Sequence, residues 1–83
     1  MKVRFSRHAL VQMAERGAAR SEVVKVIQEG EEIPAKIGRR SYRLNFQYNS
    51  SWMGRRYRIK QVVPVVVEEK GKFIVVTVYV FYF

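Results

Sequence analysis

The sequence predicts an α+β domain in which two N-terminal helices pack on one face of an antiparallel sheet of three or four strands. Helix-capping residues and apolar residues at helical spacing fill residues 6–30, whereas residues 40–83 alternate polar and apolar side chains or are rich in β-branched ones. The chain has 83 residues, which suits one domain with a small core. We therefore expect residues 1–83 to form a single domain.

The first helix has a clear beginning and end. Lys2 to Phe5 alternates and predicts a short strand, and Ser6 is typical of an N-cap. We expect the helix to run through Arg16 and to stop at Gly17, a residue type that commonly ends helices. Arg16 would complement the helix dipole there.

A second helix is expected to begin at Ser21 as its N-cap, with Glu22 in the favourable first turn, and to end at Gly30. Its apolar face is formed by valines and one isoleucine. Residues 31–38, which include Pro34, are predicted to be a loop.

Three strands of a meander are predicted to follow, at residues 40–48, from Arg55 to Val67, and at 73–83, with turns at 49–54 and 69–72. The first is expected to direct its apolar residues towards the helices; these are Tyr42, Leu44, Phe46 and Tyr48. The second would do the same with Tyr57, Ile59, Val63, Val65 and Val67.

The register of the meander decides which side chains share a face. Closing the first turn evenly sets Leu44 opposite Ile59 and therefore Arg43 beside Lys60. Closing the second tightly sets Val65 opposite Val76. The open face would then carry the following residues: Arg43, Asn45, Gln47, Arg56, Arg58, Lys60, Thr77, Tyr79 and Phe81. A slip of one residue in either turn would change this arrangement.

The charge pattern points to a polyanionic partner. The chain has a net charge of +9, and the stretch between Glu32 and Glu68 contains eight bases and no acid. Aromatic residues lie among these bases and could stack on nucleobases. The alternative is a solvated basic face that only keeps the protein soluble.

We expect the nucleic-acid-binding residues to come from this stretch and from the last strand. They are Arg39, Arg40, Tyr42, Arg55, Arg56 and Tyr79. Arg43, Arg58 and Lys60 would form a cation cluster that positions a phosphate or, in an enzyme, stabilises the charge of a transition state.

His8 and Lys60 are the candidates for proton transfer. His8 is the only histidine and titrates near neutral pH, and Lys60 would have a depressed pKa between other cations. The alternative for His8 is an exposed helix residue with no task, because it lies opposite the apolar face of its helix.

Composition argues against several other classes. The chain has no cysteine and no aspartate, so we expect neither disulfides nor a metal-dependent site, and no cofactor. The N-terminus lacks a signal-peptide pattern, and the apolar run at 73–83 is too short for a membrane helix. These features predict a cytoplasmic protein without a membrane partner.

The motif from Phe5 to Leu10 and from Met13 to Gly17, followed by a valine-rich helix, resembles a short bacterial family of unknown function. That family's helix reads H-A and then R-M-x-E-R-G, and Val75 to Tyr79 is similar to its last strand. His8, Ala9, Arg16 and Gly17 match, as do Thr77 and Tyr79. Gln12 departs from the base usual before Met13, and Ala18 to Arg20 departs from the usual apolar link between the helices.

The resemblance implies the fold of the RelE/ParE toxins, whose relatives include ribosome-dependent messenger-RNA endonucleases and gyrase poisons. It therefore implies a toxin acting as a metal-independent endoribonuclease. Arg43 and Arg58 would hold the phosphate, Lys60 or His8 would move protons, and Tyr42 and Tyr79 would stack bases.

Two alternatives remain open. One is a non-catalytic module that binds RNA or other nucleic acid through the same face. The other is an interaction protein, such as half of a toxin–antitoxin pair, because the apolar strand end at Tyr79 to Phe83 could pair with an antitoxin strand or a second copy.

Overall fold

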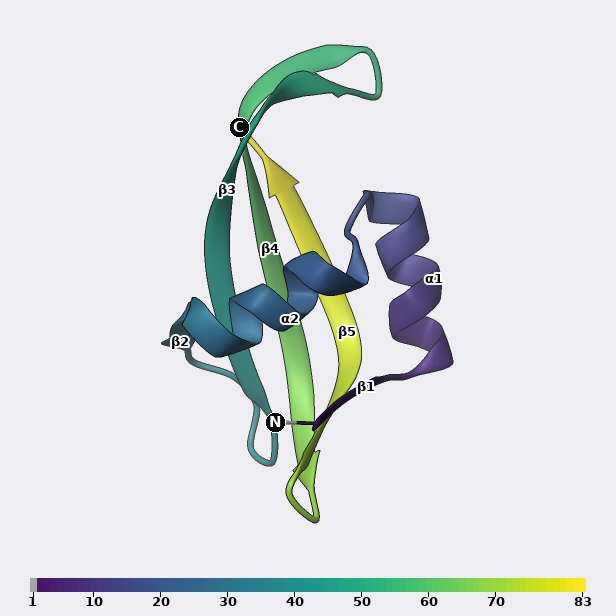
Figure 1. Ribbon diagram of the computed structural model, residues 1–83, viewed down its shortest axis with the longest axis vertical. Coiled ribbons are helices and arrows are strands. Elements are labelled where there is room, and N and C mark those ends of the chain that lie inside the picture. Colours follow the sequence, from purple (N-terminus) through teal and green to yellow (C-terminus); the bar gives the residue numbers. More distant parts are fainter. Residues whose placement is uncertain (1) are drawn as a thin grey trace.

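Two helices, α1 (Arg7–Arg16) and α2 (Arg20–Glu29), lie across one face of a five-stranded sheet in the computed structural model, which describes residues 2–83 (Figure 1). The predicted α+β class is confirmed, but the predicted number of three or four strands is too low. The strands are β1 (Lys2–Phe5), β2 (Glu31–Ile33), β3 (Arg40–Trp52), β4 (Arg55–Glu69) and β5 (Lys72–Tyr82).

The sheet has the order β1-β5-β4-β3-β2 and is mixed rather than purely antiparallel. β1 pairs in parallel with the start of β5, from Lys72 to Val75, while β2 to β5 form the predicted antiparallel meander. The extra strand is β2, which pairs with residues 41–43 where we expected a loop. Three residues beside Pro34 carry too weak a local pattern to indicate a strand.

The helix ends follow their capping chemistry. The Ser6 side chain accepts a hydrogen bond from the Ala9 amide, and Gly17 closes α1 in the left-handed region at φ 83°, both as predicted. α2 begins at Arg20, with Ala19 at the N-cap position instead of Ser21. Glu22 stabilises this N-terminus, because its carboxylate accepts a hydrogen bond from the Ala19 amide at 2.9 Å.

The two long hairpins close with two-residue turns. Met53 and Gly54 have φ of 51° and 82°, and Lys70 and Gly71 have φ of 49° and 76°. The turn predicted at residues 69–72 is confirmed, but the one predicted at 49–54 is much shorter. β3 therefore continues to Trp52, and a register shift between Gln47 and Ser50 marks a bulge.

The bulge between Gln47 and Ser50 reverses the predicted face of β4 beyond it. Without this bulge, the pairing of the hairpin from Trp52 and Arg55 would set Leu44 opposite Val63, which keeps the predicted face. Leu44 pairs with Val62 instead of Ile59, three residues further along. An odd offset moves every side chain of a strand to the other face. Val62 and Val66 consequently lie in the core with Tyr42, and the prediction that Val63, Val65 and Val67 would face the helices is wrong.

The faces of β3 and β5 agree with the predictions. Leu44 and Phe46 pack against the core between sheet and helices, while Tyr79 and Phe81 are about half exposed on the open face. A bulge between Val65 and Val66 sets Val65 opposite Thr77 instead of Val76. The open face is therefore more apolar and less basic than predicted.

Side chains of α1 cover part of the edge of β5, because β1 reaches only to Val75. The Val78 amide donates to Gln12 Oε1 at 2.9 Å, and its carbonyl accepts from Arg16 Nη1 at 2.7 Å. Arg16 thus bonds the sheet rather than the last carbonyls of its own helix. Neither α1 nor α2 has the length and apolar content that a membrane crossing requires.

Candidate nucleic-acid interface

The structure disperses the eight bases that the sequence places between Glu32 and Glu68. They do not share the predicted basic sheet face. They lie in four places: Lys36 and Arg39 in the loop before β3, Arg40 and Arg43 at the start of β3, Arg55, Arg56 and Arg58 at the end formed by the β3–β4 hairpin, and Lys60 beneath the helices.

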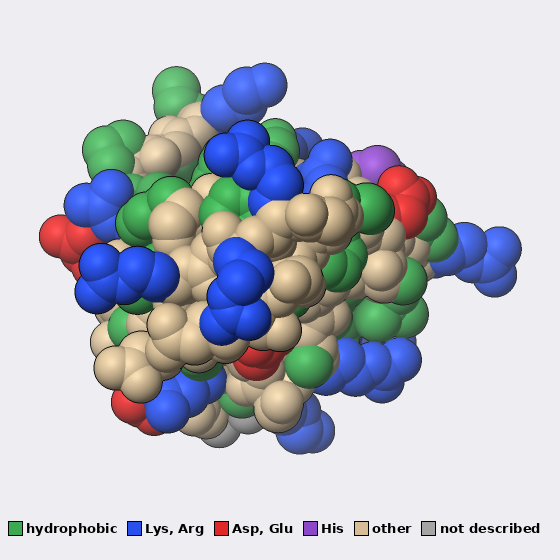
Figure 2. Space-filling view, turned by 90° about the horizontal axis from the view of Figure 1, so that it is seen from above, with side chains coloured by type: hydrophobic (Ala, Val, Ile, Leu, Met, Phe, Trp, Pro, Cys, Tyr) green, Lys and Arg blue, Asp and Glu red, His purple; other side chains and the backbone are tan. Residues whose placement is uncertain are grey.

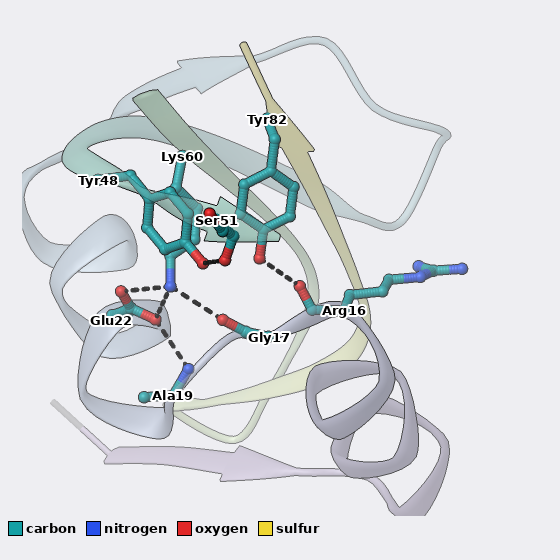
Figure 3. Close-up of polar contacts among 8 residues, drawn as sticks. All are labelled: Arg16, Gly17, Ala19, Glu22, Tyr48, Ser51, Lys60 and Tyr82. Carbon is teal, nitrogen blue, oxygen red and sulfur yellow. Dashed lines mark hydrogen bonds and ion pairs between the residues drawn. The ribbon is translucent and has the colours of Figure 1, made fainter. Parts of the chain in front are cut away.

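Lys60 lies on the helix side of the sheet and is 7% exposed (Figure 3). Its Nζ donates to the Gly17 carbonyl at 2.9 Å and pairs with both Glu22 carboxylate oxygens, at 2.8 and 2.9 Å. The prediction that Lys60 lies beside Arg43 on the open face is therefore wrong. Its contacts join the α1–α2 turn to β4.

Arg40 and Arg43 are exposed cations that have carboxylate partners. Arg40 pairs with Glu32 at 3.0 Å and Glu68 at 3.2 Å, and Arg43 pairs with Glu31 at 2.6 Å. The hydrogen bond from Arg40 lowers the pKa of Glu32. A nucleic acid would have to displace these acids to reach either guanidinium group.

Tyr42 lies in the core and is 6% exposed. Its ring packs at 6.5 Å from that of Phe73, and burial raises the pKa of its hydroxyl. Stacking of a nucleobase on Tyr42 would require an opening of the core.

Three arginines remain at the hairpin end: Arg55, Arg56 and Arg58. All three are exposed, and within residues 2–83 none of them has a carboxylate within ion-pair distance. Arg55 lies 5.8 Å from the centre of the Tyr57 ring, and Arg56 donates to the Asn49 carbonyl at 3.0 Å. Figure 2 looks down on this end and shows Lys and Arg side chains across it, with acidic side chains mainly towards the margins.

An aromatic cluster supports the hairpin from the helix side. The Tyr82 ring lies 5.1 Å from Trp52, 5.2 Å from Tyr48 and 5.6 Å from Tyr57. The Tyr82 hydroxyl donates to the Arg16 carbonyl at 2.8 Å (Figure 3), and burial raises its pKa to about 12. Sequence reasoning missed Tyr82, because an apolar strand end does not reveal which side chain reaches a helix.

The other predicted site residues lie apart from the hairpin. His8 is exposed in the first turn of α1, at the end of that helix that points away from the hairpin (Figure 1). Tyr79 is 45% exposed on the open face, with the Arg16 guanidinium group 5.4 Å from its ring centre. Arg39 is exposed in the loop before β3. The four predicted catalytic residues, which are His8, Arg43, Arg58 and Lys60, therefore form no common cluster.

Glu22 has two structural roles, of which sequence reasoning predicted neither. We predicted it only as a favourable first-turn acid, yet it caps α2 and neutralises Lys60. Among residues 2–83, no three His, Cys, Asp or Glu side chains are grouped so that they could hold a metal ion.

Comparison with known proteins gives one match. Residues 5–80 match the model of a family described as a domain of unknown function (DUF4258). No curated protein and no solved structure matches the chain. The relation to the RelE/ParE toxins therefore stays a prediction.

Proposed function

We propose that this chain, which belongs to the DUF4258 family of domains of unknown function, is a non-catalytic nucleic-acid-binding module that contacts phosphates through Arg55, Arg56 and Arg58. The observation that carries the proposal is the absence of carboxylate partners for these three arginines in the described structure. Guanidinium groups without a carboxylate partner can donate two parallel hydrogen bonds to a phosphate without first releasing an acid.

The shape of this region supports the proposal. β3 and β4 continue as a two-stranded ribbon beyond the helices (Figure 1), and the bulge near Asn49 increases its twist. Two-stranded ribbons can enter a nucleic-acid groove, and the net charge of +9 attracts a polyanion from a distance. Arginines on such a ribbon are suited to positioning contacts with the backbone.

Binding is better supported than cleavage. RNA cleavage without a metal needs a proton-transfer group close to the phosphate-binding cations. Lys60 is bound to Glu22, and His8 lies at the far end of α1 from the hairpin. The endoribonuclease hypothesis thus remains a prediction without an assembled catalytic set.

A salt titration tests the proposal. Binding of a single-stranded RNA and of a duplex DNA would be measured by fluorescence anisotropy across a range of salt concentrations. We expect affinity to fall as salt rises, because phosphate binding releases counterions. In the variant with Arg55, Arg56 and Arg58 all changed to Gln, the slope of log K against log salt for the RNA should shrink by about 2, since each lost phosphate contact removes roughly 0.7.

The matched control changes Arg40 and Arg43 to Gln, because those arginines already have carboxylate partners. This control removes two charges rather than three, so we expect a smaller change of slope for each arginine removed. Equal changes of slope per arginine in the two sets would show that only net charge matters and would reject the hairpin as the interface. The same RNA, recovered after incubation, should be intact; cleavage that is lost in His8→Ala, a change at an exposed residue, would instead establish the enzyme.

A further inference from the structure

A pocket on the open face of the sheet is separate from the hairpin. It has a volume of about 310 Å³ and lies between the loop before β3 and strands β3, β4 and β5. Its apolar lining comes from Ile33, Pro34, Ala35, Val63 and Val65. This size is at the lower end for small-molecule sites, which are mostly apolar with a few polar groups that orient the ligand.

The polar part of the lining is cationic. Lys36 and Arg39 line the pocket, and among the described residues no acid lines it and neither cation has an ion-pair partner. The Arg39 amide donates to the Lys36 carbonyl at 3.0 Å, and Gly38 has φ of 82°, so the two residues are the ends of a tight turn. This turn places both cationic residues in the loop that lines one side of the pocket.

Tyr79 and Thr77 of β5 also line the pocket, as does Ser41 of β3. The Arg16 guanidinium group lies 5.4 Å from the centre of the Tyr79 ring. The ring of Phe81 is nearly parallel to that of Tyr79, with the ring centres 6.5 Å apart. These contacts limit its freedom, and a preorganised aromatic ring next to an apolar floor suits a flat ligand. The Thr77 hydroxyl can donate or accept a hydrogen bond.

We infer that this pocket binds one nucleotide, with the base against Val63, Val65 and Tyr79 and the phosphate on Lys36 and Arg39. The pocket's own chemistry selects a flat, apolar anion, and the identification of that anion as a nucleotide rests on the proposed function. In a bound strand, the occupant would be an unstacked base. The hairpin arginines and the pocket would then be two contacts of one binding surface, the first positioning the backbone and the second accepting a base.

The experiment uses AMP and CMP as probes and follows the backbone amides by NMR. We expect saturable shifts at residues 33, 35–41, 63, 65 and 77–79; Pro34 and Pro64 have no amide proton. Adenosine and inorganic phosphate, added separately, should each bind at least tenfold more weakly than AMP, because each makes only half of the contacts. Shifts confined to the hairpin, or none up to about 10 mM AMP, would overturn the inference.

Three variants separate this inference from the proposed function. Arg39→Gln and Tyr79→Leu should each weaken AMP binding by about fivefold or more, and neither side chain belongs to the buried core, so the amide spectrum should otherwise be retained. Arg56→Gln, the control at the hairpin, should weaken the binding of long RNA and leave AMP binding unchanged. AMP binding that survives both pocket variants would reject the pocket, whatever the hairpin does.

Discussion

Six cations of the stretch between Glu32 and Glu68 form two groups that differ in their partners rather than in their sequence neighbourhood. Arg40, Arg43 and Lys60 each have a carboxylate partner, whereas Arg55, Arg56 and Arg58 have none among the described residues. Both groups come from the same acid-free stretch. The acids that neutralise the first group lie outside that stretch, and the fold brings them in.

The comparison teaches how a run of like charges should be interpreted. Strand pairing carries Glu31 and Glu32 to Arg43 and Arg40, and helix packing carries Glu22 to Lys60. The hairpin end receives no acid, because it extends beyond the helices and beyond β2 (Figure 1). Unpaired charge is thus a property of position in the fold, and the four predictions that follow test this difference.

The largest effect should follow from breaking the buried pair. Lys60→Met should lower the free energy of unfolding by about 3 kcal/mol, because the partly buried Glu22 loses its partner and the Gly17 carbonyl loses a donor. Urea unfolding measures the change. The double variant Lys60→Met with Glu22→Gln should recover part of the loss, since Gln can still accept from the Ala19 amide.

The control for that experiment is Arg58→Met, two residues away on the same strand and exposed. It should change the free energy of unfolding by less than about 0.5 kcal/mol. Equal destabilisation by both substitutions would mean that the pairing of Lys60 does not distinguish the two groups of cations.

Tyr82 connects the β3–β4 hairpin with α1. Its substitution should lower the free energy of unfolding by less than Lys60→Met does. Tyr82→Phe deletes the hydrogen bond to the Arg16 carbonyl and should cost about 1 kcal/mol. The pKa of Tyr82 is raised to about 12 from an ordinary value of 10. The neutral hydroxyl therefore contributes fully to the stability of the fold below pH 10, and this contribution is lost as pH rises through 12. Unfolding curves from neutral to alkaline pH should show a steeper alkaline loss for the natural protein than for Tyr82→Phe. Parallel pH profiles would contradict this assignment.

The surface pairs of Arg40 should contribute still less, and their contribution should depend on pH. The pKa of Glu32 is below its ordinary value of 4.5, so the pair stabilises the fold above that value and is lost as pH falls through the folded-state pKa. The difference in urea midpoint between the natural protein and Arg40→Gln should therefore shrink in acid and in high salt. A difference that stays constant in acid would exclude the ion pairs as its cause.

The smallest effect on stability is expected at the hairpin. Arg56→Gln removes one exposed hydrogen bond to the Asn49 carbonyl and should change the free energy of unfolding by less than about 0.5 kcal/mol. A stability loss as large as that of Lys60→Met would show that the hairpin arginines serve the fold rather than a ligand.

Much of the fold could be predicted because its signals are local. Ser6 and Gly17 mark the ends of α1, Lys70 and Gly71 form a two-residue turn, and the alternation in β3 faces its apolar residues to the helices. The parallel pairing of β1 with β5 could not be predicted, because it joins the two ends of the chain and has no local signature.

The candidate site was harder to predict, because the face of β4 depends on one bulge in β3. The turn at Met53 and Gly54 shifts the pairing by an even number of residues, which keeps the faces. Asn49, with φ of 46°, lies in the bulge that adds the one residue needed to make the shift odd. That single change places Lys60 under the helices and Gln61 on the open face, where it bonds Asn45. Residue types suggested a basic protein correctly, but not which bases stay unpaired.

The contacts of Gln12 and Arg16 with Val78 affect how readily the edge of β5 opens locally. Both bonds engage the Val78 backbone, so two side chains of a helix act there as a neighbouring strand would. The Val80 amide points to the same edge by alternation, where no described strand or helix side chain covers it in this way. Deuterium should therefore enter Val80 quickly and Val78 slowly, and Gln12→Ala should make the two rates alike.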